Sequence, residues 1–405
     1  MDVNEQIENL EKQLLKLRKK YYIKSFFRKA KRLVTDFLPL DSIPFQNYKE
    51  KFVVEEANTI EIFLPNTFDQ PQASIEKTIN SVEVFALQDV YCIPDSTYFL
   101  NLKKDKIYYE KWHDDSRIHY LYNTKNLIQH GVTLAKVQNH KIKHFDTEAI
   151  FLGGIFTFNY YHFFIEILSK TEFFKTIPDY KNKIIVVDSC VDNNQNMKDL
   201  LSFFTKDCKI VFLNSASYYH FKTLWHITSP SYTIPNVATG SRYEAGFSRF
   251  SKKSLAYLRQ KCFENFDYQQ VKIEVVKKIF ISRKSQFRKY NEQEILGVSQ
   301  KYGFTEVFFE DLNIHEQIFI INNADYIIGP SGAAWTNLLF AKDGAKGLAW
   351  LSSVWGDFSV FSTIAKMVNF DLNFFIYPQI TDDFHEDFIL DSEIFEKQLE
   401  KLLQL

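Results

Sequence analysis

One stretch of the sequence pairs a histidine with a carboxylate. In the segment 153–168, which reads GGIFTFNYYHFFIEIL, His162 and Glu166 are four residues apart, so a helix would place them on one face. A carboxylate beside a histidine orients the imidazole and raises its basicity, as a general base requires. The alternative is a structural histidine, hydrogen-bonded where a helix meets a sheet. The pair is therefore a candidate general base.

A second stretch could bind a phosphate. The segment 324–340, ADYIIGPSGAAWTNLLF, predicts a buried strand that runs into Gly329-Pro330-Ser331-Gly332 and a helix that begins at once. Free N–H groups and the positive end of the helix dipole would then face the carboxyl end of the strand, where a phosphate fits. Small residues at 332–334 would let a ligand approach the backbone closely. The alternative is an ordinary tight turn between a strand and a helix.

A third stretch is basic. The segment 281–290, ISRKSQFRKY, follows a predicted strand directly and carries Arg283, Lys284, Arg288 and Lys289. Arginine forks bind diphosphates through two hydrogen bonds and can neutralise a departing one. Four exposed basic residues also occur in ordinary solvated loops. Because Arg283 comes right after a strand and would face the helix start near 331, we favour it as a diphosphate ligand.

The pattern of strands and helices positions these stretches. Residues 50–150 read as short strands, for example 51–54, 60–64, 82–87 and 107–110. Strands at 149–154, 183–188 and 209–213 then alternate with helices near 159–175 and 195–205, and a looser stretch, 214–245, follows. The C-terminal half repeats the alternation, with strands at 277–282, 304–309, 325–329 and 346–352 and helices at 291–302, 313–323, 331–341 and 357–368. We expect an α/β fold with two Rossmann-like parallel-sheet halves facing a cleft, where ligands bind at the carboxyl ends of the strands.

The chain divides into four predicted parts. They are an N-terminal helical arm (1–38), an α/β domain with a strand-rich beginning (39–245), a second Rossmann-like domain (246–391) and a terminal helix (392–405). A long helix at 243–266 would link the two halves, and Asn313 is a plausible N-cap of the helix 313–323.

The formal net charge of −1 hides a basic arm. Residues 1–32 hold ten Lys and Arg against four Asp and Glu, whereas the rest of the chain holds 39 against 46. Apolar residues recur in the arm at heptad spacing, which predicts a short coiled coil and a homo-oligomer: Val3, Ile7, Leu10, Leu14, Leu17 and Tyr21. Residues 16–32 are basic and aromatic, so they could lie on an anionic membrane surface or pack on the protein's own body. Nucleic acid is not expected as a partner, because the body is acidic and would repel phosphates.

Several function classes are excluded by what the sequence lacks. It contains no D-x-D, the usual two-carboxylate motif that binds a nucleotide-bound divalent metal. It also contains no G-x-S-x-G and no H-E-x-x-H, which argues against serine-hydrolase and zinc-peptidase chemistry. Its four cysteines lie far apart, as expected in a reducing cytosol. The N-terminus is polar, so we expect no signal peptide, and no apolar run reaches the roughly 18 residues that span a bilayer.

Taken together, the three stretches resemble glycosyltransferase family 61, which includes bacterial capsular-polysaccharide biosynthesis proteins. The matching residues lie between about 150 and 355: Asn159-Tyr160-Tyr161-His162 with Glu166, Ser282-Arg283, Glu316-Gln317, and Gly329-Pro330-Ser331-Gly332-Ala333 with Asn337. Many relatives have a histidine where this chain has Ser331, so the donor contacts at that position are expected to differ.

The resemblance implies a GT-B fold and an inverting, usually metal-independent transfer from a nucleotide sugar to a glycan or lipid-linked glycan. His162 would then be the catalytic base, with Glu166 orienting it. The donor and its diphosphate would be bound by Arg283, Lys284, Arg288, Glu316, Gly329, Pro330, Ser331, Gly332, Ala333 and Asn337. Asn159, Tyr160, Tyr161 and Trp335 adjoin these motifs and are expected to contact the acceptor or stack on a ring. No cofactor is implied, and the expected location is the inner face of the cytoplasmic membrane.

Two other functions compete with this interpretation. One is a non-catalytic scaffold that binds nucleotide sugars and assembles other enzymes through the coiled coil. The other is a transferase of a sugar phosphate or polyol phosphate in a phosphate-containing capsule.

Overall fold

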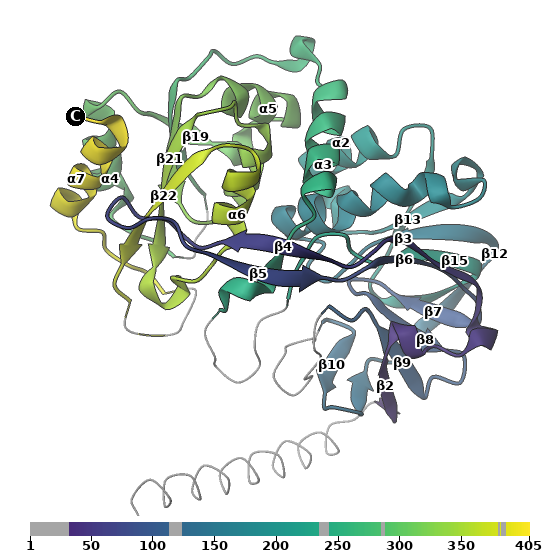
Figure 1. Cartoon of the computed structure of the whole chain (residues 1–405). Coiled ribbons are helices and arrows are strands. Elements are labelled where there is room, and N and C mark those ends of the chain that lie inside the picture. Colours follow the sequence, from purple (N-terminus) through teal and green to yellow (C-terminus); the bar gives the residue numbers. More distant parts are fainter. Residues whose placement is uncertain (1–31, 113–123, 235–242, 285–287, 380, 382–385) are drawn as a thin grey trace, which may run out of the picture.

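The computed structural model describes residues 32–112, 124–234, 243–284, 288–379, 381 and 386–405. Within these ranges the chain forms two α/β halves, each built on its own sheet (Figure 1). Most of the predicted arm lies outside the described residues, including the heptad positions from Val3 to Tyr21 and, except for Arg32, the stretch 16–32 predicted to lie on a membrane surface. The described remainder of the arm enters strands β1 (Arg32–Val34) and β2 (Asp36–Pro39) rather than a helix.

The N-terminal half is a mixed sheet of ten strands among the described residues. Its parallel part has the order β14 (Lys209–Leu213), β13 (Ile184–Asp188), β12 (Lys141–Leu152) and β15 (Ser217–Ile227). On the other side of β15 the sheet continues with β7 (Val90–Ile93), β8 (Tyr98–Asn101) and β9 (Lys106–Tyr109), each antiparallel to the strand before it, and ends with β2, which is parallel to β9. In addition, β6 (Val82–Leu87) pairs with both β15 and β3 (Tyr48–Glu55). The expected parallel sheet is therefore present in part of the N-terminal half, and the strand-rich beginning joins the same sheet through β15.

The C-terminal half has the expected parallel sheet. Its order is β19 (Thr305–Phe308), β18 (Lys278–Ser282), β20 (Tyr326–Pro330), β21 (Lys346–Ser352) and β22 (Asp371–Tyr377), and all pairs are parallel. The next strand in the chain, β19, lies on one side of β18, whereas β20 lies on the other side. The topological switch point of the sheet is therefore between β18 and β20. Open α/β sheets bind ligands at the carboxyl ends of the strands at such a point. This mixed α/β architecture is compatible with a GT-B-like fold.

Helices fill the predicted positions, although two of them are not α-helices. The segment predicted as a helix over 159–175 forms a π-helix, η3 (His162–Ile167), and a 3₁₀ helix, η4 (Leu168–Thr176). The one predicted over 331–341 is a 3₁₀ helix, η10 (Ala333–Phe340). The α-helices are α2 (Gln195–Phe204), α3 (Lys252–Glu264), α4 (Glu292–Lys301), α5 (Ile314–Asn323), α6 (Val360–Met367) and α7 (Ser392–Leu403).

Short elements complete the described chain. In one small sheet β11 (Ala135–Val137) lies between β1 and β10 (Leu127–His130). Two others pair β4 (Asn58–Phe63) with β5 (Ser74–Ile79) and β16 (Tyr232–Thr233) with β17 (Ser248–Arg249). The remaining 3₁₀ turns are Leu40–Ser42, Phe45–Asn47, Tyr180–Asn182, Val191–Asn193, Ala245–Phe247, Tyr268–Gln270, Phe309–Asp311 and Ser353–Trp355. No helix among the described residues is both long and apolar enough to cross a bilayer.

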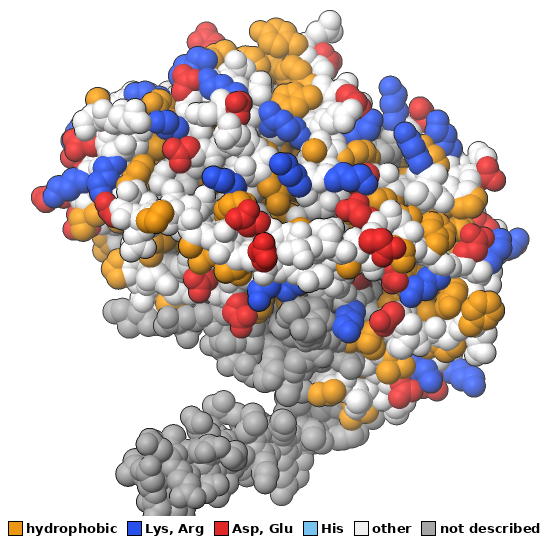
Figure 2. Space-filling view, in the orientation of Figure 1, with side chains coloured by type: hydrophobic (Ala, Val, Ile, Leu, Met, Phe, Trp, Pro, Cys, Tyr) orange, Lys and Arg blue, Asp and Glu red, His pale blue; other side chains and the backbone are white. Residues whose placement is uncertain are grey.

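The hairpin β4–β5 ties the two halves together. It extends from the N-terminal half toward α6 and β22 (Figure 1). At the end of β4, the backbone N–H of Phe63 donates to Oγ1 of Thr363 at 3.1 Å, and Oγ of Ser362 donates to the Phe63 carbonyl at 2.7 Å. On the face shown in Figure 2, acidic and basic side chains are interspersed over both halves, so that face has no large field of one sign.

A buried charge cluster stabilises the N-terminal half. Glu110 accepts a 2.5 Å hydrogen bond from the Ser229 N–H, and its Oε2 lies 3.8 Å from Nζ of Lys170 and 3.4 Å from Nε2 of His226. All three side chains are buried. Burial alone would raise the pKa of Glu110, but the charge of Lys170 and the contacts with His226 and Ser229 outweigh it and lower this pKa to about 2.

We expect Glu110→Gln to lower the free energy of unfolding by about 3 kcal/mol at pH 7, because Lys170 is left buried without its counter-charge. The folded-state pKa of Glu110 is lowered, so its contribution is present above the unfolded pKa near 4 and is lost as the pH falls toward about 2. Denaturant unfolding at pH 7 and pH 2.5 measures this. The variant and wild type should differ less at pH 2.5. Glu83→Gln, which removes a partly exposed ion pair with Lys51, serves as the control and should cost under about 1 kcal/mol. An equal loss in both variants would contradict the account.

Candidate active site

The predicted histidine–carboxylate pair forms at the carboxyl end of β12. Nδ1 of His162 lies 2.8 Å from Oε2 of Glu166, across one turn of η3. The other carboxylate oxygen, Oε1, accepts the backbone N–H of Thr233 at 2.7 Å. Glu166 is thus fixed from two sides, and an Nδ1–H that donates to it leaves Nε2 of His162 as the proton acceptor. This geometry is compatible with an oriented general base.

Aromatic residues surround the imidazole. The ring of Phe156 lies 5.1 Å from that of His162, and the ring of Tyr161 lies 4.9 Å from it, centroid to centroid. Phe156 has a φ of 63°, a left-handed conformation that is costly for a bulky residue and is typical of functional loops. Two residues on, Phe158 is 69% exposed. An exposed aromatic ring beside a candidate base could contact an acceptor.

A small pocket lies beneath the pair. It is lined by Thr97, Trp112, Gly154, Ile155, Phe156, Glu166, Ile167, Ser229 and Thr233. Oγ1 of Thr97 is buried there and makes no hydrogen bond among the described residues. No sequence pattern points to Thr97 or Trp112, because both belong to the strand-rich beginning and only the tertiary fold brings them to Glu166.

The basic stretch and the glycine turn meet at the switch point of the C-terminal sheet. Arg283 follows β18 and Ser331 follows β20, and both line one pocket. The full lining is Arg283, Arg288, Pro330, Ser331, Trp350, Leu351, Ser352, Trp355, Tyr377, Gln379 and Phe388. The predicted proximity of the two stretches is therefore present. The aromatic residues of this pocket come from after residue 349, outside the segments that the sequence analysis selected.

Two guanidinium groups share this pocket. Nη2 of Arg283 donates to the backbone carbonyl of Arg288 at 2.6 Å. Burial lowers the pKa of Arg283, and burial together with the charge of Arg283 lowers the pKa of Arg288 to about 10. Both groups remain charged at pH 7. A bound anion would reduce the repulsion between two like charges in a partly buried pocket. A diphosphate has enough oxygens to accept hydrogen bonds from both guanidinium groups.

The turn after β20 completes the pocket. The N–H of Ser331 donates to the Trp350 carbonyl at 3.0 Å, whereas the N–H groups that open η10 have no acceptor within that helix. A Cβ on Gly332 would come within 3.7 Å of the Arg288 guanidinium, so the turn passes close beside it. Gly329 has a different role, because its Cβ would clash with Ile281 at 2.7 Å. Gly329 is required by strand packing, and the open N–H groups belong to 332–334.

Three other predicted donor residues make internal contacts. Lys284 pairs with Asp311 at 2.5 Å, which directs its ammonium away from the pocket. The two oxygens of Glu316 accept the backbone N–H groups of Lys272 at 3.1 Å and of Asn313 at 3.0 Å, the latter within a capping box that confirms Asn313 as N-cap. The third residue, Asn337, is part of the contact between the halves.

Trp335, predicted to stack on a ligand, lies in the core. It is 1% exposed, and its Nε1–H donates to the Pro330 carbonyl at 3.0 Å. This bond braces the turn at 329–332 from behind. The structure therefore gives Trp335 a supporting position and does not bring its face to the pocket.

Two hydrogen bonds join the segments that carry the two sites. The hydroxyl of Tyr160 donates to Oδ1 of Asn337 at 2.8 Å, and Nδ2 of Asn337 donates to Oε1 of Gln317 at 3.0 Å. Asn337 lies in η10, and Tyr160 stands two residues before His162. The segment that carries the candidate base is thereby held against the helix that follows the phosphate turn.

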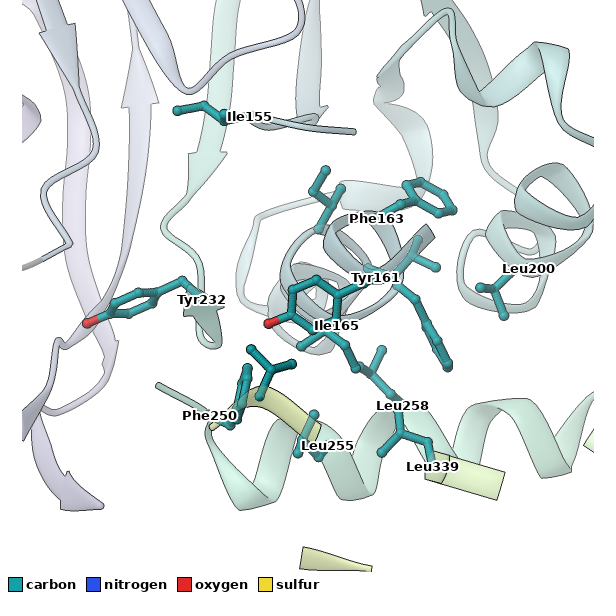
Figure 3. Close-up of a cluster of buried hydrophobic side chains, with 14 of the residues drawn as sticks. Ile155, Tyr161, Phe163, Ile165, Leu200, Tyr232, Phe250, Leu255, Leu258 and Leu339 are labelled. Carbon is teal, nitrogen blue, oxygen red and sulfur yellow. The ribbon is translucent and has the colours of Figure 1, made fainter. Parts of the chain in front are cut away.

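Apolar packing supports the same junction. Figure 3 shows Tyr161 of the base segment in one buried cluster with Phe250, Leu255, Leu258 and Leu339 of η10. The hydroxyl of Tyr161 also contacts Oγ1 of Thr233 at 2.5 Å, and its N–H donates to Oδ1 of Asn159 at 2.9 Å. Tyr160, Tyr161 and Asn159 thus shape the base segment from within.

The architecture and its switch-point pocket define an α/β protein whose fold is compatible with the GT-B type. Residues 160–348, which include His162, Glu166, Arg283 and Ser331, match the family model described as Glycosyltransferase 61. The match confirms the resemblance predicted from the sequence and supports a glycosyltransferase. No curated protein matches the chain.

Proposed function

We propose that the protein is an inverting glycosyltransferase that moves a sugar from a nucleotide-sugar donor to a growing surface glycan of the capsule or lipopolysaccharide type. The observation that carries this proposal is the hydrogen bond between Tyr160 and Asn337. It joins the segment of the His162–Glu166 pair to the helix behind the Arg283 pocket, within one family region. A base and an anion site so connected are the two parts that a displacement at an anomeric carbon needs.

In the proposed reaction, Nε2 of His162 takes the proton from the acceptor hydroxyl as the oxygen attacks the anomeric carbon. Glu166 keeps the imidazole oriented and stabilises the positive charge that it gains. The bond from the anomeric carbon to the diphosphate breaks on the opposite face, which inverts the configuration. Arg283, Arg288 and the N–H groups of 332–334 stabilise the negative charge on the leaving diphosphate. Because two arginines supply positive charge there, the proposed mechanism requires no divalent metal.

The basic arm supports a membrane surface as the location of the proposed reaction. Residues 16–32 hold nine Lys and Arg and no acidic residue, a composition suited to an anionic membrane surface where lipid-linked acceptors are extended. We expect deletion of 1–32 to abolish flotation of the protein with vesicles that contain phosphatidylglycerol. Vesicles of phosphatidylcholine alone are the control. Unchanged flotation would assign the arm another role, such as self-association.

A transfer assay separates this function from its two competitors. The purified protein is mixed with a panel of nucleotide sugars and lipid-linked acceptors, with a chelator present, and the product is analysed by NMR. The proposal predicts a glycoside of inverted anomeric configuration. A phosphodiester in the phosphorus spectrum would identify a sugar-phosphate transferase instead, and nucleotide-sugar binding with neither transfer nor donor hydrolysis would identify a scaffold.

A further inference from the structure

A second pocket lies where the strands of the C-terminal sheet begin, opposite the strand ends that carry the Arg283 pocket. It has a volume of about 570 Å³, within the range of small-molecule sites, and is formed by the loop of the β4–β5 hairpin, the starts of β21 and β22, and the end of α7. Its lining is Asn66, Thr67, Phe68, Asp69, Gln70, Pro71, Gln72, Lys346, Asp371, Asn373, Lys401, Leu402 and Gln404. The proposed diphosphate pocket lies at the other end of the strands, about 20 Å away along β21.

Specific contacts hold the walls of this pocket in place. The Asn66 carbonyl accepts the N–H of Phe374 at 2.7 Å, and Nδ2 of Asn66 donates to Oδ1 of Asn373 at 3.0 Å. Nδ2 of Asn373 in turn donates to Oδ1 of Asp371 at 3.1 Å, and Asn373 is only 3% exposed. The hairpin loop is therefore fixed to the sheet edge by a buried amide chain, so the pocket is built before any ligand arrives.

The pocket offers both donors and acceptors without a net charge. Two cations, Lys346 and Lys401, face two carboxylates, Asp69 and Asp371, and amides supply most of the remaining polar groups. Lys401 is paired with Asp69 at 2.6 Å, whereas Lys346 makes no ion pair within the described part of the chain. Oδ1 of Asn66 is buried and accepts no hydrogen bond from any described group.

The charges and polar groups of this pocket favour one class of ligand over the others. A phosphate needs an excess of positive charge, and the pocket has none. A metal ion needs clustered ligands, and no group of three or more His, Cys, Asp or Glu side chains among the described residues could hold one. Vicinal hydroxyl groups, which donate and accept at once, match paired amides, a carboxylate and an ammonium, and Phe68 adds an apolar surface for a ring face.

We propose that this pocket binds a neutral sugar unit of the glycan chain, separately from the site of transfer. The inference rests on the proposed function, because a transferase acting on a growing glycan meets such chains. A second contact about 20 Å from the diphosphate pocket would retain the chain near the reaction site and raise its effective concentration there. Most of the pocket lies outside residues 160–348, which match the family model, and is formed by the β4–β5 hairpin and the C-terminal helix.

Saturation-transfer NMR on the full chain tests the proposal without any donor or transfer step. The probes are the methyl glycosides of glucose, galactose, mannose, N-acetylglucosamine and N-acetylgalactosamine. We expect at least one to bind and Lys346→Met to weaken it about tenfold, because the ammonium is removed while the aliphatic stem stays. Gln70→Ala, at an exposed loop position, should weaken it as well. Lys397→Met, on the exposed face of α7, is the matched control and should change nothing.

Three results would overturn the proposal: no glycoside binds, binding is unchanged in both pocket variants, or inorganic phosphate displaces the sugar. The outcome is separable from that of the proposed function. A protein that binds a glycoside through Lys346 but transfers no sugar would refute only the transferase, and one that transfers sugar but binds no glycoside there would refute only the pocket.

Discussion

Arg283→Ala is expected to weaken the binding of nucleoside diphosphates by roughly 10- to 100-fold, since a charged hydrogen bond contributes about 1.5–3 kcal/mol. The guanidinium stands at the switch point of the parallel sheet and shares its pocket with Arg288, Pro330 and Ser331. Titration calorimetry with UDP, GDP and CDP measures the effect. Arg283→Lys should recover only part of the affinity, because an ammonium keeps the charge but cannot form the fork.

The neighbouring lysine provides the control for this experiment. Lys284 has the same charge at the next position, but it pairs with Asp311. Lys284→Ala should therefore leave the affinity within about twofold. Equal losses in the two variants would mean that net charge alone attracts the nucleotide, and unchanged affinity in Arg283→Ala would remove that residue from the site. Melting temperatures of both variants show whether the loss of the bond to the Arg288 carbonyl disturbs the fold.

His162→Ala is expected to lower turnover by roughly 100- to 10,000-fold, the usual contribution of a positioned general base. The nucleotide should still bind with nearly wild-type affinity, because the diphosphate pocket belongs to the other half. Glu166→Gln should also lower turnover, since an amide can donate to the imidazole and favour the wrong tautomer. Steady-state kinetics with the donor and acceptor that the transfer assay identifies measure both.

A histidine elsewhere on the same half serves as the comparison. His144 lies on β12 at an exposed position, close to His220 and away from Glu166. His144→Ala should keep wild-type turnover. If His162→Ala also kept it, the base would have to be another group, and the pair with Glu166 would be a structural contact.

Local patterns predicted the parts of the fold that are set locally. The alternation of strands and helices in the C-terminal half follows from short apolar runs and capping residues, and Asn313 caps its helix as expected. The proximity of Arg283 and Ser331 also followed, because the carboxyl ends of neighbouring parallel strands meet at one edge. The pair His162–Glu166 needed only helical spacing.

The remaining features depend on contacts far apart in the sequence. β15 reads SYYHFKTLWHI, so no polar alternation marks it as a strand, and it is buried between β12 and the antiparallel strands. Trp335 is buried in a core cluster whose other members come largely from distant parts of the chain. The carboxylate of Glu316 is occupied by Lys272, which lies 44 residues earlier. No local sequence pattern predicts which distant residue will form a hydrogen bond with a given side chain.

The central claim is that the Arg283 pocket receives the donor diphosphate. A crystal of the full chain soaked with nucleoside diphosphates tests it most directly. We predict density for the diphosphate between the guanidinium of Arg283 and the N–H groups of 332–334, on the side of the sheet where β18 and β20 end. A nucleotide bound elsewhere, with that pocket empty, would contradict the account.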